Sequence, residues 1–398
     1  MIRVAEINAF NFGSTGNIMY NIAKIASEKE ICVKTFCPTA RMTKKYQNAD
    51  NILFGTIMER RGCERLARII PMHDFLNIFA TRELLRYLDE FKPDIIHFHN
   101  LHGDYVNLKM LFLYAKKNEI KVVWTFHDCW PFTGHCPYFT YVNCKKWIDK
   151  CHDCTQYKEY PKSYVDDSKI LYEKKKRVFN SLSDCVIVTP SEWLKELVSK
   201  SFLAKYEIMV INNGIDLNKF KPSFYDINIR QKYNLENKFI ILGVAYLWDR
   251  RKGLDRLIQI SEKLDEKYQI IIVGEVSKDE NLGNIIHISR TANQSELAEL
   301  YSAANVFINP TYEDNFPTVN IEALACGTPV LTYNTGGSPE SIDDKTGEII
   351  DDDTVVEAIV RWCNRTKPVE QCVNRAKQYD ANNRFEEYIQ LYTRLIRK

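Results

Sequence analysis

Long hydrophobic runs and a strong net charge are both missing from this 398-residue sequence. The longest apolar stretches, such as residues 110–114 and 270–273, are much shorter than the ~20 residues that span a bilayer. Met1–Val4 lead directly into a strand-like pattern, without the charged start and apolar core of a signal peptide. A net charge of +2 gives no sign of the strongly basic surface that nucleic-acid binding needs. We therefore expect a cytoplasmic protein that neither crosses a membrane nor binds nucleic acid.

The charged residues are unevenly divided between the two halves of the chain. Residues 1–200 contain 30 Lys and Arg against 23 Asp and Glu, whereas residues 201–398 contain 24 against 29. A chain of this length has room for two or three domains, each with its own core. We expect a first domain over 1–205, a second over 206–375, and a terminal helix over 376–398 that can cross back to the first domain.

Short strand-like runs alternate with helical patterns, for example at Glu83–Phe91 and Leu254–Leu264. Such alternation is typical of parallel sheets covered by helices, so the sequence predicts an α/β protein with two doubly wound domains. Ligands of such domains bind beyond the carboxyl ends of the strands. The predicted strands are Arg3–Phe10, Ile31–Cys37, Asp94–Phe98, Val122–Phe126, Cys185–Thr189, Ile208–Ile211, Phe239–Val244, Gln269–Val273, Ile285–Ile288, Val306–Asn309 and Pro329–Thr332.

Two glycines follow the first predicted strand, within Phe12–Asn17. Gly13 and Gly16 would let the backbone approach a ligand closely, and the N-terminus of the next helix favours an anion. The spacing differs from the G-x-G-x-x-G of dinucleotide-binding enzymes. A tight turn between strand and helix is an equally good interpretation.

A basic loop, Arg250-Arg251-Lys252-Gly253, stands between another predicted strand and helix. Arg offers a forked set of donors and Lys a point charge, so this loop could neutralise a diphosphate. A solvated run of charges is the alternative.

A third loop contains Asp314, and Glu322 follows eight residues later on a helix that should begin near Pro317. Helix amides together with a carboxylate suit a phosphate and a sugar hydroxyl. Simple helix capping is the alternative here.

Taken together, these segments resemble the family 4 retaining glycosyltransferases with the GT-B fold. The resemblance rests on the RKG loop, the carboxylate-x7-Glu segment running into EALACGTPV, the NTGG turn at 334–337 and NNGID at 212–216. Segments 13–16, 97–103 and 125–130 are similar to a subgroup associated with bacterial capsule, exopolysaccharide and O-antigen assembly. The resemblance implies two Rossmann-like domains facing a central cleft.

The resemblance also implies a role for each matching residue. Lys252 and Arg251 would hold the donor diphosphate, and Glu322 would contact the ribose. Asp314 stands where a glutamate facing the donor sugar is usual, and Glu313 sits one position too early, so either carboxylate can be the one that reaches the sugar. The other implied residues are His127 at the donor sugar, Gly13 and Gly16 over the phosphates, Phe316 and Thr318 at the donor, and His99 and Asn100 on the acceptor side.

The implied reaction is front-face transfer with retention, in which the leaving phosphate helps to deprotonate the acceptor hydroxyl. Preorganised cations and helix amides would stabilise the developing charge, so we expect no metal cofactor in catalysis. The implied partners are a nucleotide-sugar donor and a glycan acceptor, commonly lipid-linked. A nucleotide-sugar epimerase of similar architecture and a non-catalytic carbohydrate-binding protein remain alternatives.

A cysteine-rich segment is expected to form an insertion at about 129–160. Four of its thiols could bind a structural zinc ion in a tetrahedral site. Buried reduced thiols are the alternative, since disulfides are not expected in a chain without an export signal. The four candidate ligands are Cys136, Cys144, Cys151 and Cys154.

Arginines and apolar residues are mixed between Met58 and Phe79. A basic amphipathic segment can lie on anionic lipid, and this would place the protein peripherally on the inner face of the cell membrane. An ordinary helix packed on the first sheet is the alternative interpretation.

Overall fold

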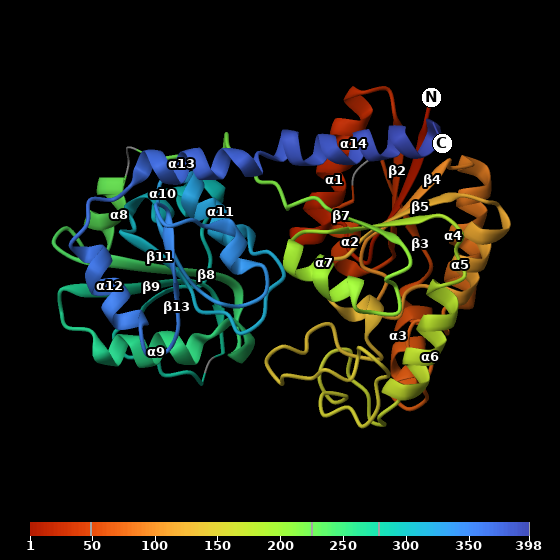
Figure 1. The fold of residues 1–398 in the computed structure, drawn as a ribbon, viewed down its shortest axis with the longest axis horizontal. Helices are drawn as coiled ribbons and strands as arrows, with labels where there is room; N and C mark the ends of the chain where they lie inside the picture. The colour runs from red at the N-terminus through yellow and green to blue at the C-terminus, as the bar shows by residue number, and fades with distance from the viewer. Residues whose placement is uncertain (48–49, 224–225, 278, 398) are drawn as a thin grey trace. The chain divides into compact units, whose positions relative to one another are not determined.

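The computed structural model describes residues 1–47, 50–223, 226–277 and 279–397, with the backbone alone at 226–228. The chain divides into two compact units, each built on its own sheet (Figure 1). No helix of the described residues combines the length and the apolar character needed to cross a bilayer. The first unit contains Met1–Asn212 and Arg384–Lys398, and the second contains Asn213–Asn383.

The first unit has a seven-stranded parallel sheet in the order β3-β2-β1-β4-β5-β6-β7. Its strands are β1 (Arg3–Ile7), β2 (Cys32–Pro38), β3 (Asn51–Phe54), β4 (Ile95–Phe98), β5 (Lys121–Thr125), β6 (Cys185–Thr189) and β7 (Glu207–Val210). Its helices are α1 (Gly13–Glu28), α2 (Arg41–Lys45), α3 (Ile57–Ala67), α4 (Ile78–Phe91), α5 (Leu108–Lys117), α6 (Ser168–Phe179) and α7 (Glu192–Ser199), with a 3-10 turn η1 (Trp130–Phe132) and most of α14 (Ala381–Arg397).

The second unit has a six-stranded parallel sheet in the order β10-β9-β8-β11-β12-β13. Its strands are β8 (Phe239–Trp248), β9 (Tyr268–Val276), β10 (Ile286–Ile288), β11 (Val306–Asn309), β12 (Val330–Tyr333) and β13 (Gly347–Ile350). Its helices are α8 (Asp226–Lys232), α9 (Leu254–Lys263), α10 (Gln294–Ala303), α11 (Thr318–Ala325), α12 (Val355–Cys363) and α13 (Val369–Ala376), with 3-10 turns η2 (Arg250–Lys252), η3 (Ser338–Ser341) and η4 (Lys377–Tyr379).

These strands have apolar residues at successive positions in the sequence because both faces of each sheet are buried. All the residues of β4 and of β11 are buried, as expected for parallel strands covered by helices on both sides. The predicted architecture of two doubly wound parallel domains is confirmed. Two short strands, β3 and β13, were not predicted from the sequence, because four residues carry too little periodicity to stand out.

The division between the units lies slightly later than the predicted residue 205. β7 continues the first sheet beside β6, which keeps the chain in the first unit as far as Asn212. The predicted terminal helix begins at Ala381, after the short turn η4. From Arg384 onward this helix belongs to the first unit.

Candidate active site

The basic loop is held between β8 and α9 by a capping aspartate and a glycine. The Asp249 carboxylate accepts a hydrogen bond of 2.9 Å from the Lys252 amide. Gly253 has a φ of +78°, and a Cβ there would lie 2.2 Å from the Pro310 carbonyl oxygen. Only glycine fits this close approach, which brings the loop against the chain that leaves β11.

Residues 311–314 meet the basic loop through backbone and side-chain contacts. The Arg251 carbonyl accepts a hydrogen bond from the Tyr312 amide (2.9 Å), and the Arg251 guanidinium donates to the Glu313 carbonyl (3.2 Å). The Lys252 Nζ atom lies 2.6 Å from a carboxylate oxygen of Asp314. The structure therefore brings four of the predicted site residues together at the carboxyl ends of β8 and β11.

Asp314 and Glu313 differ in where their carboxylates stand. The Glu313 side chain is buried, whereas the half-buried Asp314 carboxylate is paired with Lys252. The NTGG turn supports this arrangement, because a Cβ on Gly336 would lie 1.6 Å from the Asp314 carbonyl oxygen. The Asp314 carboxylate is thus aligned with the basic loop.

Helix α11 carries the second predicted carboxylate, Glu322. Its carboxylate accepts a 3.0 Å hydrogen bond from the Tyr301 hydroxyl. Burial raises the pKa of Glu322 to about 7, against the lowering effect of hydrogen bonds from Tyr301 and Thr318. This carboxylate is therefore partly protonated at neutral pH, and a ligand hydroxyl that donates to it would favour its charged form.

Phe316 and Thr318 stand just before and at the start of α11. The Phe316 ring is buried in the core of the second unit and packs on Tyr379, with ring centroids 5.5 Å apart. A contact of residue 316 with a donor would therefore come from its backbone. Thr318 is half-buried in the first turn of the helix.

In the first unit, the glycine loop after β1 leads straight into α1. Phe12 occupies the N-cap position without a side-chain hydrogen bond to the helix, and Gly13 has a φ of +69° with open space where a Cβ would stand. A Cβ on Gly16 would lie 2.6 Å from the backbone of Asn11. Gly16 therefore allows close packing inside the loop, while Gly13 leaves the start of the helix accessible.

His99 and His127 are brought together from the ends of β4 and β5. Nδ1 of His99 lies 3.1 Å from Nε2 of His127, and the two rings stack with centroids 5.4 Å apart. Nε2 of His99 lies 3.9 Å from a carboxylate oxygen of Glu6 on β1. These two buried atoms have no hydrogen-bond partner within the described residues.

Burial controls the protonation of this cluster. It lowers the pKa of His127 to about 4 and that of His97 to about 3, and it raises the pKa of Glu6. The histidines are therefore neutral at physiological pH, where each ring offers one donor and one acceptor.

Helix α14 reaches the same cluster with two tyrosines. The Tyr392 hydroxyl lies 2.7 Å from Nδ1 of His97, and Nε2 of His97 lies 2.8 Å from the Thr125 hydroxyl. The Thr125 and Tyr388 hydroxyls are 3.1 Å apart. The terminal helix thus completes the hydrogen bonds of a buried histidine next to His99.

Another buried pair flanks His127 and was not found from the sequence. The Asp128 carboxylate lies 2.8 Å from Nε2 of His102, and Nδ1 of His102 lies 2.8 Å from the Tyr160 hydroxyl.

Asn100, predicted on the acceptor side, is half-buried, and its carbonyl accepts a 2.8 Å hydrogen bond from the Tyr105 hydroxyl.

Two signals could have revealed the missed residues. Glu6 is an acidic residue inside an apolar strand pattern, and His102 follows His97 and His99 in one short segment.

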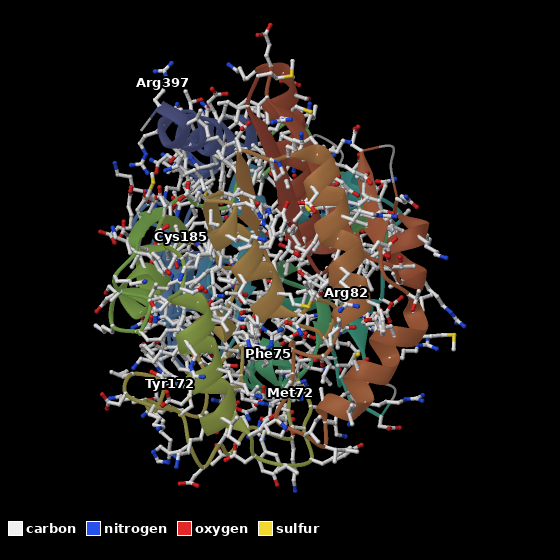
Figure 2. All side chains as sticks on the ribbon, turned by 90° about the vertical axis from the view of Figure 1, so that its right-hand side faces the viewer. Met72, Phe75, Arg82, Tyr172, Cys185 and Arg397 are labelled. Carbon is white, nitrogen blue, oxygen red and sulfur yellow. The ribbon has the colours of Figure 1, made fainter. Side chains whose placement is uncertain are left out.

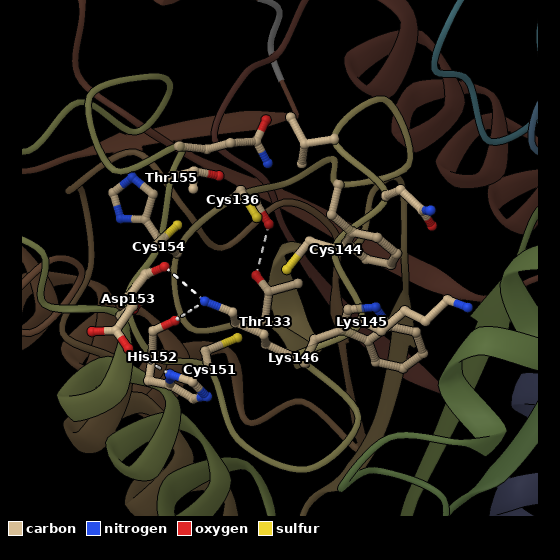
Figure 3. Close-up of a pocket in the computed structure, with 17 residues that line it drawn as sticks. Thr133, Cys136, Cys144, Lys145, Lys146, Cys151, His152, Asp153, Cys154 and Thr155 are labelled. Carbon is tan, nitrogen blue, oxygen red and sulfur yellow. Dashed lines mark hydrogen bonds and ion pairs between the residues drawn. The ribbon is translucent and has the colours of Figure 1, made fainter.

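The four predicted zinc ligands line one pocket of about 250 Å3 in the insertion (Figure 3).

Two protein families match almost the whole chain. Residues 16–219 match the family described as Glycosyltransferase Family 4, and residues 226–379 match Glycosyl transferases group 1. The first match includes His99 and His127, and the second includes Lys252, Asp314 and Glu322.

Relatives and a solved structure agree with this match. WcaC of Escherichia coli K12, named as a glycosyl transferase of colanic acid biosynthesis, is 22% identical over 76% of this chain and 77% of its own length. The N,N'-diacetylbacillosaminyl-diphospho-undecaprenol alpha-1,3-N-acetylgalactosaminyltransferase of Campylobacter jejuni is 25% identical over 49% of this chain and 56% of its own. HepE of Anabaena, solved with UDP and glucose, is 14% identical, covers 99% of this chain and 100% of its own, and has a TM-score of 0.70.

Proposed function

This chain belongs to glycosyltransferase family 4, and we propose that it transfers a sugar from a nucleotide-sugar donor to a lipid-linked glycan acceptor in bacterial surface polysaccharide synthesis. The glycosyltransferase activity and the GT-B fold follow from the family matches and the fold likeness. The epimerase and carbohydrate-binding alternatives are not favoured. The donor, acceptor and mechanism are the parts proposed here.

The observation that carries the proposal is the pairing of Lys252 with Asp314 beside Arg251. Two cations at the carboxyl ends of β8 and β11 suit the diphosphate that leaves during transfer. Because these cations can supply the positive charge, we propose that catalysis needs no metal ion. Diphosphate binding would compete with Asp314 for the Lys252 ammonium and free that carboxylate for a sugar hydroxyl.

The other site residues receive roles from the same proposal. Glu322 would accept hydrogen bonds from the ribose, and α1 after Gly13 would offer its first amides to phosphate oxygens. His127 would contact the donor sugar as a neutral ring. Because the proposal includes no protein nucleophile, retention would require front-face attack, in which the leaving phosphate helps to deprotonate the acceptor hydroxyl.

The acceptor proposal draws on the relatives. The C. jejuni relative is named for an undecaprenol-linked substrate, and WcaC for a surface polysaccharide. A lipid-linked acceptor requires the enzyme to reach a membrane surface, and we propose a peripheral, cytoplasmic location.

The segment around α3 supports this membrane contact. Its exposed apolar side chains include Met58, Leu66 and Ile69, and Phe79 at the start of α4 is 72% exposed. Arg61 and Arg65 are exposed on the same helix, and Arg82, labelled in Figure 2, is exposed on α4. Apolar tips beside arginines are the combination that binds anionic lipid interfaces.

The test is a reconstituted transfer reaction. A thermal-shift screen against nucleotide-sugars identifies the donor, because a ligand that binds the native state raises its stability. The purified chain is then incubated with that donor and an undecaprenyl-diphosphate-linked sugar in vesicles. The proposal predicts acceptor-dependent nucleotide release and an α-linked product from an α-linked donor, seen by NMR. Inversion at the anomeric carbon, or donor turnover independent of any acceptor, would contradict it.

A further inference from the structure

The cysteine-rich insertion lacks the regular structure that usually holds a segment in place. Between η1 and α6, residues 133–167 are all described and contain neither helix nor strand. Phe132, Phe139 and Trp147 make a small aromatic core, with ring centroids 5.1 Å apart in the Phe132–Trp147 and Phe139–Trp147 pairs. A loop of this length with so small a core needs a further constraint to offset the conformational entropy that it loses when it becomes ordered.

Four thiols line the same pocket as Phe139 and Trp147 of this small core. Cys136, Cys144, Cys151 and Cys154 all line the same pocket, and Figure 3 shows their sulfur atoms directed into it. All four cysteines are free thiols.

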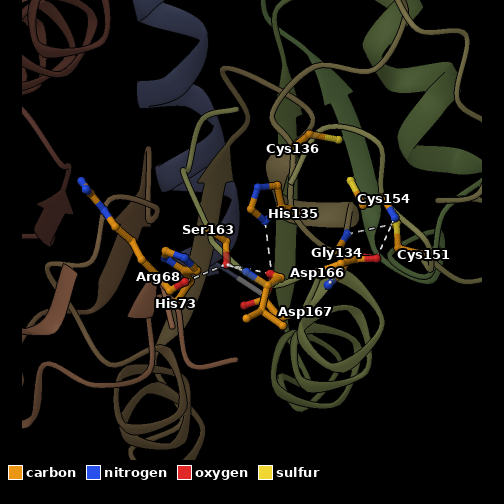
Figure 4. A network of polar contacts seen from close by, with 12 residues as sticks. Arg68, His73, Gly134, His135, Cys136, Cys151, Cys154, Ser163, Asp166 and Asp167 are labelled. Carbon is orange, nitrogen blue, oxygen red and sulfur yellow. Dashed lines mark hydrogen bonds and ion pairs between the residues drawn. The ribbon is translucent and has the colours of Figure 1, made fainter. Parts of the chain in front are cut away.

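The local backbone is arranged to receive a thiolate. The Gly134 amide donates a 3.1 Å hydrogen bond to the Cys151 sulfur (Figure 4). A Cβ on Gly134 would lie 2.8 Å from the Cys151 Cβ and 2.1 Å from the Ser168 carbonyl oxygen, so glycine alone permits this approach. Amide donors of this kind stabilise metal-bound sulfur.

Basic side chains offset the charge that four thiolates would bring. The Lys146 ammonium is hydrogen-bonded to the carbonyls of His152 and Asp153, at 3.1 and 2.9 Å. The buried Lys175 Nζ atom donates hydrogen bonds to the carbonyls of Trp130 and Thr133, at 2.9 and 3.1 Å. A four-thiolate zinc centre carries a net charge of about −2, which the Lys146 ammonium would partly offset.

From this geometry we infer that Cys136, Cys144, Cys151 and Cys154 bind one structural zinc ion that closes the insertion. With Zn–S bonds of about 2.3 Å, the sulfur atoms of such a tetrahedron lie about 3.8 Å apart. Across the described part of the chain, three ligand atoms all within 4.8 Å of one another occur only at Glu6, His97 and His99. The four sulfurs therefore draw closer together when they bind the ion.

The cluster of Glu6, His97 and His99 is a weaker candidate for a metal. Both ring nitrogens of His97 already have partners, in Tyr392 and Thr125. Only two ligands would remain there. The cysteine pocket, by contrast, offers four thiols of the type that zinc prefers.

Metal analysis of the full-length protein tests the inference. Protein purified without chelator should contain one zinc per chain, and Co²⁺ exchanged for zinc should show the intense visible bands of tetrahedral thiolate coordination. Cys151→Ser should lower the zinc content to less than a tenth and lower the melting temperature. Cys363→Ser, in the second unit, is the matched control and should keep one zinc per chain.

Two further measurements keep the test decisive if Cys151→Ser fails to fold. Three other side chains of a type that can bind zinc line the pocket, namely His135, His152 and Asp153. His135→Ala, His152→Ala and Asp153→Ala should each leave the zinc content unchanged. A thiol count on the native wild-type chain should find these four cysteines protected until the zinc is chelated. Wild-type protein without zinc that also fails to bind Co²⁺, or a disulfide within this group, would overturn the inference.

Discussion

Lys252 and Asp314, 62 positions apart in the chain, are joined by an ion pair of 2.6 Å. The pair exists because Gly253 lets the basic loop pack against Pro310, the first residue after β11. Neither side chain is fully buried, so a ligand can reach both. Under the proposed function, the ion pair would hold the lysine in place for a diphosphate that displaces the carboxylate.

Removing the lysine charge should cost most of the activity. Lys252→Ala should lower kcat/KM for the donor by about 10²- to 10³-fold, the loss typical when one preorganised charge-stabilising group is removed. Nucleotide release measured with saturating acceptor checks this prediction. Lys263→Ala, an exposed lysine at the end of α9, is the control and should retain full activity. Equal activities of the two variants would place the diphosphate elsewhere.

Gly253→Ala should damage the site through the backbone. The new Cβ would collide with the Pro310 carbonyl in a left-handed conformation, so we expect a loss of several kcal/mol in stability or a displaced loop. Thermal unfolding and donor binding measure the two effects. Gly62→Ala, where a Cβ meets nothing within 4 Å, should be close to neutral. A Gly253→Ala variant with wild-type melting and binding would contradict the geometry of this loop.

The raised pKa of Glu322 predicts a pH-dependent stability. Folding keeps this carboxyl protonated up to about pH 7, whereas in the unfolded chain it ionises near 4.5. The native state therefore binds more protons between these values, and its stability falls as the pH rises through them. Glu322→Gln keeps a partner for Tyr301 and should remove this part of the slope.

Melting temperatures at pH 5 and pH 8 measure the effect. The gain of Glu322→Gln over wild type should be larger at pH 8 than at pH 5. The exposed Glu262→Gln is the control and should show no such difference. A gain for Glu322→Gln that does not change with pH would show that the carboxyl is ionised throughout.

The histidine cluster predicts the opposite slope at acid pH. His127 and His97 stay neutral down to about pH 4 and 3 in the folded chain, but in the unfolded chain they bind protons near 6.5. Stability should therefore fall as the pH drops from 6.5 towards 4. His127→Gln should reduce the loss of melting temperature between pH 6.5 and pH 5. An unchanged loss would indicate that His127 is protonated in the native state.

Membrane contact should depend on the arginines of α3. Arg61→Glu with Arg65→Glu should abolish sedimentation with vesicles rich in anionic lipid, because each basic residue contributes about 1 kcal/mol of attraction. Lys116→Glu with Lys117→Glu, at the end of α5, makes the same change in net charge and should leave binding unaffected. Equal losses in both double variants would indicate a nonspecific effect of net charge.

Much of the site could be predicted because its residues lie within short segments. Lys252 follows a strand directly, and Asp314 and Glu322 share one loop and helix, so local periodicity already located them. Their pairing required the carboxyl ends of β8 and β11 to meet, which the parallel order of the sheet explains. Phe316 lies in the same segment, but only packing revealed that its ring belongs to the core.

The sequence by itself determined the two α/β domains, the glycosyltransferase motifs and the cysteine spacing, because each is encoded by periodicity or by residues close in the chain. Only the tertiary structure decided that the Asp314 carboxylate pairs with Lys252, and that Glu6 and Tyr392 lie beside His97. Glu6 and Tyr392 are 386 positions apart and meet at 3.3 Å. No local pattern reports such a contact, because it arises when the terminal helix packs on the first sheet and buries polar groups that must then bond to one another.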